Sequence, residues 1–243
     1  KRCVIGGSAC PKFMIEDFHR KYGVEVIHAW GMTETSPLGT VNRPLRKHIS
    51  LSQPQKYNLA IKQGRPMYGV KIKITDDNGR LLPNDGKAFG NLWVKGPWIC
   101  SGYLNISNSE VHDKNGWFLT GDVASIDGDG FMLITDRVKD VIKSGGEWIS
   151  SIELENIANS HPNVDQCAVI GVHHPKWEER PVLLVVQNKS SKANLESELL
   201  DWFQNKVAKW WIPDKVIFID ELPLTATGKV SKLALREKYS KVV

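Results

Sequence analysis

Apolar residues in the first 30 positions predict a strand, a helix and a second strand. The runs 2–5 and 24–30 are apolar enough for short buried strands. Between them, Pro11 and Gly23 are typical of a helix start and a helix end. The apolar residues at four-residue spacing in this helix are Met14, Phe18 and Tyr22. This order predicts one βαβ unit from the end of a larger α/β sheet.

From Gly64 to about Thr135 the pattern changes to short alternating runs broken by turns, which predicts antiparallel strands. The pair Asn78-Gly79 is a strong hairpin signal, because both residue types tolerate the left-handed backbone that tight hairpin turns need. We therefore expect a small β-rich subdomain that is antiparallel or barrel-like.

Helices and strands are mixed beyond Arg137. Ser150 and Glu153 have the spacing of a capping box at a helix start. The runs 166–172, 181–188 and 215–220 predict strands, and a short helix is expected near the end. A further helix should place one apolar face on the core, formed by Leu195, Leu199, Phe203 and Val207.

Two domains are predicted from these patterns. Residues 1–136 form the α/β end of a large domain, with the β-rich subdomain from about residue 64. Residues 137–243 form a compact α+β C-terminal domain.

Composition narrows the classes of function. The 32 basic and 27 acidic residues give a net charge of +5 and are scattered, which gives little support to nucleic-acid binding. No run approaches the roughly 18 apolar residues of a membrane span, and no charged-then-apolar leader opens the chain. The chain begins without methionine, so we expect a piece of a longer protein. The widely spaced Cys3, Cys10, Cys100 and Cys167 are expected to be reduced, buried thiols of a cytosolic protein.

Two motifs combine hydroxyls and carboxylates near predicted strand ends. In "WGMTETSP" (30–37), Thr33 could contact a phosphate and Glu34 a magnesium ion, although a polar loop with a helix cap is an equal alternative. The segments "TGD" and "DRVKD" bracket a predicted hairpin, so Asp122 and Arg137 should share one end of it. A carboxylate there suits the paired hydroxyls of a ribose, and a purely structural ion pair is the alternative.

Two further segments carry glycines beside lysines. In "IKSGGEWIS", Gly145-Gly146 could let a thin ligand pass close to the backbone, or could simply form a left-handed turn. In "LPLTATGKVSK", Lys229 could reach into a neighbouring domain, or remain a solvated lysine. "IDGDGF" looks like a calcium loop but has Phe131 at a ligand position, so a hairpin turn is expected. Turn or surface positions are expected for His161, His173 and His174.

Taken together, "WGMTETSP", "GWFLTGDVASIDGDGF", "DRVKDVIKSGGEWISSIELEN" and "LPLTATGKVSK" resemble, in order and spacing, the motifs of the acyl-adenylate-forming (AMP-binding) superfamily. The form "IKSGGEWISS" is most similar to the medium- and long-chain fatty-acid:CoA ligases, and the resemblance covers essentially the whole chain.

The resemblance implies a role for each matching residue. Trp30 lies against the adenine, Gly31 belongs to the same nucleotide site, Thr33 contacts phosphate, and Glu34 holds magnesium. Asp122 binds the ribose and Arg137 supports it, while the loop Gly6-Gly7-Ser8-Ala9 borders the adenine and acyl pocket. Lys139 is the hinge, and Lys229 serves adenylation. The segment that enters for thioester formation and lines the pantetheine tunnel contains Lys143, Gly145, Gly146 and Glu147.

The implied activity is that of an acyl-CoA synthetase, an acid-thiol ligase that uses ATP, Mg²⁺ and coenzyme A in the cytoplasm. The Ser/Thr/Gly-rich phosphate loop of the superfamily is absent from this sequence, so we expect a C-terminal fragment that is inactive alone. The alternatives are an adenylate-forming enzyme with another acceptor, a carrier protein or an oxidation, and a non-catalytic nucleotide-binding fragment. The implied partners are small-molecule substrates, and no nucleic acid is implied. The sequence is compatible with peripheral membrane association and with a homodimer, and it does not specify the acyl chain length.

Overall fold

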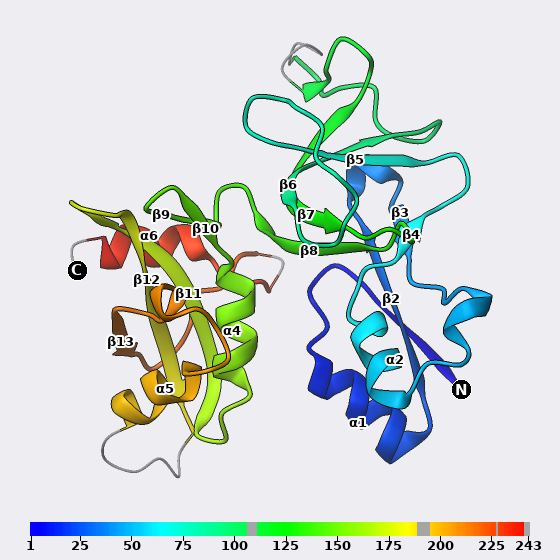
Figure 1. Cartoon of the computed structure of the whole chain (residues 1–243). Coiled ribbons are helices and arrows are strands. Elements are labelled where there is room, and N and C mark those ends of the chain that lie inside the picture. Colours follow the sequence, from blue (N-terminus) through cyan, green and yellow to red (C-terminus); the bar gives the residue numbers. More distant parts are fainter. Residues whose placement is uncertain (106–110, 189–194, 227, 241–243) are drawn as a thin grey trace. The chain divides into compact units, whose positions relative to one another are not determined.

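The computed structural model describes residues 1–105, 111–188, 195–226 and 228–240 (Figure 1). Within it the chain divides into two compact units, Lys1–Val138 and Lys139–Val243.

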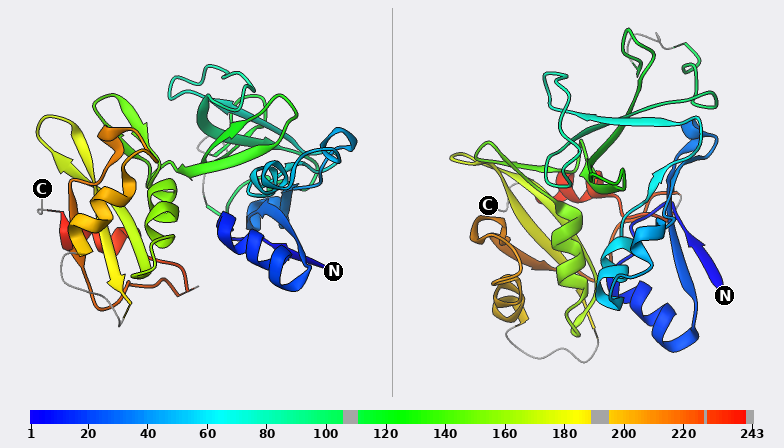
Figure 2. Two further views of the ribbon diagram at one scale, coloured as in Figure 1. Left: turned by 60° about the horizontal axis from the view of Figure 1, so that its bottom comes forward. Right: turned by 45° about the vertical axis from the view of Figure 1, so that its right-hand side comes forward.

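The first unit begins with a mixed sheet of four strands in the order β1-β2-β3-β4. β1 and β2 are parallel and α1 connects them, so the predicted βαβ unit is confirmed. A second helix, α2, packs beside α1 (Figures 1 and 2). The bounds are β1 Arg2–Ile5, α1 Lys12–Tyr22, β2 Glu25–Gly31, β3 Leu38–Val41, α2 Gln53–Ala60 and β4 Arg65–Pro66.

Helix α1 starts and ends where the sequence predicts, but it buries a different residue. Gly23 ends it in the left-handed conformation, with φ of 60°. Ile15 is the buried residue of the helix and packs with Val26 and Tyr57. Met14 and Tyr22, two of the residues at four-residue spacing, are 37% and 69% exposed, so this spacing marks the helix but not its buried face.

The β-rich subdomain is an antiparallel sheet in the order β5-β6-β7-β8. The antiparallel prediction is confirmed, whereas the barrel-like form is wrong, because the described strands make an open sheet. Asn78-Gly79 lies in a tight turn, but that turn gives only the single bridge Thr75–Leu81 before the chain continues to β6. The bounds are β5 Lys71–Thr75, β6 Phe89–Lys95, β7 Phe118–Ile126 and β8 Met132–Arg137.

The second unit is the predicted α+β fold, with a sheet in the order β10-β9-β12-β11 and β13 added parallel to β12. Helices α4 and α5 pack on one face of this sheet and α6 on the other (Figure 1). The bounds are β9 Ile142–Ser144, β10 Glu147–Ile149, α4 Ser151–Asn159, β11 Val164–His174, β12 Glu178–Gln187, α5 Leu195–Phe203, β13 Lys215–Phe218 and α6 Lys232–Tyr239.

Helix ends in this unit follow local chemistry. The Ser150 hydroxyl accepts the Glu153 N–H at 3.1 Å and caps α4, as the capping-box spacing predicts. Helix α5 stops at Phe203, and Asn205 adopts a left-handed φ of 61°. Val207 therefore lies outside the helix, contrary to the sequence prediction, yet it still packs against the same core.

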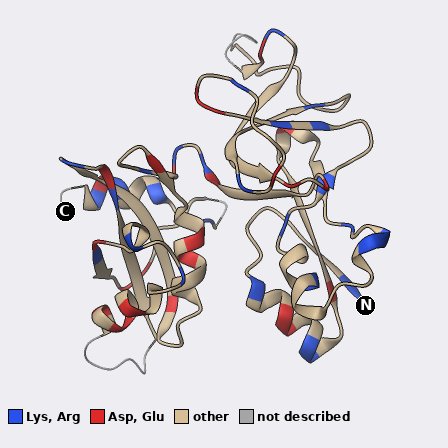
Figure 3. Ribbon diagram, in the orientation of Figure 1, with Lys and Arg blue, Asp and Glu red and all other residues tan. Residues whose placement is uncertain are grey.

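Charged residues of both signs are interspersed along the described ribbons of both units (Figure 3). Three short 3₁₀ turns complete the described elements, at Thr33–Thr35, Arg46–His48 and Lys209–Trp211.

Candidate functional site

The carboxyl ends of β1 and β2 lie at the same sheet edge because the two strands are parallel. The exposed loop of Gly6, Gly7, Ser8 and Ala9 follows β1 at this edge. Gly7 has a φ of 81°, which favours glycine, and a Cβ on Gly6 would lie 3.1 Å from the Ala29 carbonyl oxygen. The loop is thus placed close to the motif that ends β2.

That motif forms a tight turn at the end of β2. The Thr35 hydroxyl accepts the Met32 N–H at 2.9 Å and donates to the Pro37 carbonyl oxygen at 2.6 Å. A Cβ on Gly31 would lie 1.8 Å from the same Pro37 oxygen, so this turn requires glycine. The predicted cofactor residue Gly31 thus has a packing reason of its own.

Thr33 is exposed on this turn, and Glu34 is half-buried. The Tyr103 hydroxyl donates to Glu34 Oε1, and the Cys100 N–H donates to the Glu34 carbonyl oxygen at 2.8 Å. The hydrogen bond to Glu34, together with burial, raises the pKa of Tyr103 to about 12. Sequence reasoning missed Tyr103, because 69 residues separate it from Glu34 and no local pattern links them.

Asp122, Trp30 and Arg137 come together in the first unit. The Trp30 indole Nε1–H donates to Asp122 Oδ2 at 2.9 Å, and Arg137 Nε lies 3.7 Å from Asp122 Oδ1. Asp122 and Arg137 are direct partners in the β7–β8 register, which places them at one end of the hairpin. The Asp122 side chain is 13% exposed and that of Arg137 is 53% exposed.

The Trp30 ring is largely inside the core. It is 7% exposed, and a Cβ on Gly39 would lie 2.3 Å from its Cζ3 atom, so the ring covers the Gly39 backbone. Its indole N–H fixes the Asp122 carboxylate, a contact that the sequence could not indicate. A role for Trp30 against the adenine stays a prediction.

A two-residue turn in the second unit contains the predicted glycine pair. Gly145 and Gly146 have φ of 60° and 83° and join β9 to β10, as a tight hairpin requires. Glu147 is exposed beside the turn. The ammonium of Lys143 lies 5.7 Å from the ring centroid of Trp148, its cross-strand partner.

The two remaining lysines of the prediction are exposed. Lys139 is the first residue of the second unit, and its neighbour Asp140 accepts a 2.8 Å hydrogen bond from Arg236 on α6. Lys229 ends a tight turn in which the Thr225 N–H donates to the Lys229 carbonyl oxygen at 2.7 Å. Thr227 of the same motif lies outside the described residues.

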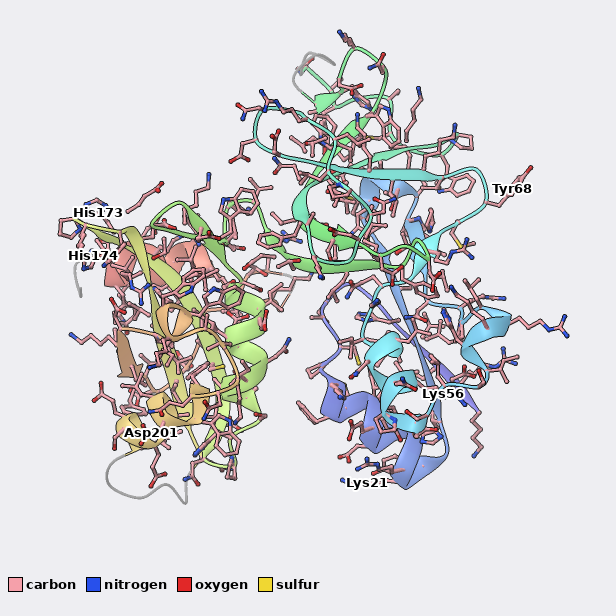
Figure 4. The ribbon with its side chains drawn as sticks, in the orientation of Figure 1. Lys21, Lys56, Tyr68, His173, His174 and Asp201 are labelled. Atoms are coloured by element: carbon pink, nitrogen blue, oxygen red, sulfur yellow. The ribbon has the colours of Figure 1, made fainter. Side chains whose placement is uncertain are left out.

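The described contacts of three histidines, His161, His173 and His174, and of the aspartate-rich turn lie within the fold. His173 and His174 end β11 (Figure 4), and His174 Nδ1 accepts the Lys176 N–H at 3.1 Å. His161 lies in the turn after α4, as one of the two expected positions, but it is buried and not at the surface; its ring packs edge-on against Trp202. Asp127 Oδ1 accepts two backbone N–H groups of the "IDGDGF" turn, which confirms a hairpin turn.

Among the described residues, no group of three or more histidines, cysteines, aspartates or glutamates could hold a metal ion. None of the described helices has both the length and the apolar character needed to cross a membrane.

Comparison with known families identifies both units. Residues 1–104 match the model of the AMP-binding enzyme family, and residues 153–229 match that of the AMP-binding enzyme C-terminal domain. The chain belongs to the AMP-binding enzyme family. The resemblance inferred from the four motifs is therefore confirmed.

Curated relatives match the chain from end to end. The 3-methylmercaptopropionyl-CoA ligase of Ruegeria pomeroyi is 54% identical over 242 residues, which is 100% of this chain and 44% of that protein. The medium-chain-fatty-acid–CoA ligase of Ectopseudomonas oleovorans is 53% identical, with the same coverage of 100% and 44%. The chain thus spans less than half the length of these relatives.

Solved structures of similar fold include the ATP-bound MatB of Rhodopseudomonas palustris, with a TM-score of 0.84 and 30% identity over 98% of this chain and 45% of that one. The o-succinylbenzoate CoA synthetase of Bacillus subtilis, in complex with its acyl-adenylate intermediate, has a TM-score of 0.82 and 32% identity, and the match covers 97% of this chain and 46% of that one.

Proposed function

We propose that the full-length protein containing this chain is an AMP-forming acyl-CoA ligase that acts on a carboxylic acid of the fatty-acid type. The observation that carries the proposal is the 53–54% identity, along the whole chain, to proteins named as CoA ligases. The reaction has two steps. A carboxylate oxygen of the acid attacks the α-phosphorus of ATP and pyrophosphate leaves; the thiol sulfur of coenzyme A then attacks the acyl carbon, and AMP and the thiol proton leave.

The first unit supplies the nucleotide site in this proposal. The Trp30 N–H and Arg137 orient the Asp122 carboxylate, and a carboxylate in this position would accept the ribose hydroxyls. The exposed hydroxyl of Thr33 is free of the turn's internal hydrogen bonds, which Thr35 makes instead, so Thr33 suits contact with a phosphate.

Glu34 suits a magnesium ion that is shared with the phosphates of ATP. Magnesium takes only one or two protein carboxylates and completes its shell with substrate phosphates and water, so the single carboxylate of Glu34 would suffice. The contacts from Tyr103 and Cys100 hold Glu34 in place on the turn. When bound, magnesium would neutralise charge on the phosphate oxygens.

The second unit would serve both steps with different residues. The ammonium of Lys229, on an exposed loop, would stabilise negative charge on the reacting oxygens during adenylation. Lys139 would be the pivot about which the unit turns between the steps. The β9–β10 hairpin with Lys143, Gly145, Gly146 and Glu147 would then line the path of the pantetheine arm.

An amine is a second candidate for the group that accepts the acyl chain. One similar structure is the amide bond synthetase McbA of Marinactinospora thermotolerans, with a TM-score of 0.83 and 28% identity. An amine would then replace the thiol in the second step. We further propose a cytoplasmic location, since the four cysteines are free thiols. A homodimer and peripheral membrane association would be examined by light scattering and vesicle sedimentation.

The test uses the full-length protein with ATP, Mg²⁺ and one acid at a time, from 3-(methylthio)propionate through octanoate to palmitate. With coenzyme A present, we expect equal amounts of AMP, pyrophosphate and acyl-CoA for at least one acid. Formation of ADP, or of acyl-AMP that coenzyme A does not consume, would contradict the proposal. An amide product from an added amine at a higher rate than the thioester would favour the alternative acceptor.

A further inference from the structure

The β9–β10 hairpin is too small to hold its own shape. Each strand has three residues, and the register contains only the pairs Glu147–Ser144, Trp148–Lys143 and Ile149–Ile142. An isolated two-stranded hairpin is at best marginally stable in water, and the register joins this one to the larger sheet through the pair Glu178–Ser144. Its position therefore depends on what the rest of the unit supplies.

The segment Trp177–Arg180, which leads into β12, contacts three consecutive residues of the hairpin, Lys143, Ser144 and Gly145. The Trp177 carbonyl oxygen accepts the Gly145 N–H at 2.9 Å. Glu179 Oε2 accepts the Lys143 N–H at 2.9 Å, and Arg180 Nη1 donates to the Ser144 hydroxyl at 3.1 Å. We call this segment the clamp.

The clamp is itself anchored in the unit. Arg180 is 9% exposed, and its Nη2 donates to Asp214 Oδ1 at 2.6 Å and its Nη1 to the Trp210 carbonyl oxygen at 2.7 Å. The Glu179 N–H donates to the Trp177 carbonyl oxygen at 2.9 Å across a three-residue turn. Glu178, at the centre of that turn, has a φ of 70°, which is strained for a residue with a side chain.

Gly171, on the neighbouring strand, has no side chain and so leaves room for the Glu179 carboxylate. A Cβ on Gly171, in β11, would lie 2.8 Å from Glu179 Oε2, the oxygen that accepts the Lys143 N–H. A side chain at Gly171 would therefore displace the acceptor of the hairpin contact without removing Glu179.

We propose that Glu179 and Arg180 are positioning residues for thioester formation, acting by fixing the β9–β10 hairpin through the Lys143 N–H and the Ser144 hydroxyl. The proposal rests on the proposed function, because the use of the hairpin in the second step comes from it. Neither residue was predicted from the sequence, where they are two of the three charged residues before the apolar run "PVLLVV".

The test uses the full-length protein with Glu179→Ala, Glu179→Gln and Gly171→Ala, and Glu221→Ala as a matched control on an exposed glutamate of the same unit. Hydrogen exchange of the 142–149 segment reports the hairpin directly. Acid-dependent ATP–pyrophosphate exchange reports adenylation, and single-turnover conversion of acyl-AMP by coenzyme A reports the second step.

For Glu179→Ala we expect exchange of the Lys143 amide to accelerate about tenfold or more, because a hydrogen bond to a charged acceptor is lost. The second step should slow by a similar factor, while ATP–pyrophosphate exchange stays within about twofold of wild type. Glu179→Gln keeps an oxygen acceptor and should recover most of the rate. Gly171→Ala should reproduce the effect of Glu179→Ala, and it serves as the test if Glu179→Ala does not fold.

Unchanged hairpin exchange in both Glu179→Ala and Gly171→Ala would overturn the proposal, as would equal losses in the two half-reactions. A wild-type protein that makes no acyl-AMP would instead contradict the proposed function, and the hairpin exchange would still decide whether the clamp exists.

Discussion

Replacing Asp122 tests whether its carboxylate only stabilises the fold or also binds the ribose of ATP. In Asp122→Ala the Trp30 indole N–H loses its acceptor, and Trp30 is only 7% exposed. An orphaned buried donor costs about 1–3 kcal/mol of unfolding free energy. The Arg137 contact adds little, about 1 kcal/mol at most, because it is 3.7 Å long and the arginine side chain is 53% exposed.

The loss of ATP affinity has a separate source. If two ribose hydroxyls donate to Asp122 in this partly buried place, their removal should weaken binding by about 2–4 kcal/mol. At about 1.4 kcal/mol per factor of ten, the Kd for ATP of the full-length protein should rise by about 30- to 1,000-fold. Isothermal calorimetry measures this change, and urea denaturation measures the stability change of the same preparation.

Asp122→Asn is the control that distinguishes the two effects. The amide keeps one oxygen that can accept the Trp30 N–H, so stability should fall by less than in Asp122→Ala. The amide also presents a donor to the ribose and to Arg137, so ATP affinity should still fall. A Kd for ATP within twofold of wild type in Asp122→Ala would refute the ribose role and leave Asp122 as a structural partner of Trp30.

Three other outcomes are expected. The 243-residue chain alone should release no AMP from ATP, acid and coenzyme A, because it has no Ser/Thr/Gly-rich phosphate loop; release above background would contradict this. Glu178→Gly relieves a φ of 70° and should raise unfolding free energy in urea by about 0–1 kcal/mol, whereas clear destabilisation would exclude strain. Burial lowers the pKa of His28 below its ordinary value of about 6.5, so the free energy of unfolding should fall as the pH drops below that value. In His28→Gln, the free energy of unfolding should depend less on pH over this range.

The sign of the His28 effect follows from proton binding. The unfolded chain takes up a proton near pH 6.5, while the folded chain resists it because the ring is buried. The Nδ1–H already donates to the Ile61 carbonyl oxygen at 2.9 Å, which fits a neutral ring. Unfolding curves at pH 7.5 and 5.5 that shift equally in wild type and His28→Gln would contradict this assignment.

Local signals predicted most of the elements, and tertiary packing decided the exceptions. Pro11 and Gly23 set the ends of α1 because proline and glycine constrain the backbone whatever surrounds them. Which face of that helix is buried depends on Val26 and Tyr57, and the four-residue spacing could not reveal those partners. Val207 was assigned to α5 from its spacing, but Asn205 ends the regular backbone first.

One contact of the candidate site could be predicted from the sequence, the others could not, and the roles of the site residues stay predictions. Asp122 and Arg137 were placed together because a hairpin turn between them fixes the register. Trp30 and Asp122 are 92 residues apart, so their hydrogen bond had no signal in the sequence. The same holds for Arg180, whose partners Ser144 and Asp214 lie 36 and 34 residues away.

We propose that the second unit serves both half-reactions through different residues, with Lys229 acting in adenylation and Lys139 acting as the pivot between the steps. Lys229→Ala removes the positive charge that, in this proposal, stabilises the reacting oxygens, so it should slow acyl-AMP formation by a factor of roughly a hundred or more. Lys139→Pro fixes φ at the pivot and removes its N–H, so it should hinder thioester formation.

The decisive measurement runs both half-reactions on both full-length variants, with ATP–pyrophosphate exchange for the first and acyl-AMP plus coenzyme A for the second. We expect that Lys229→Ala loses exchange but converts supplied acyl-AMP, and that Lys139→Pro retains exchange but fails to form acyl-CoA. Loss of both half-reactions in the same proportion in both variants would contradict the account and indicate a general folding defect.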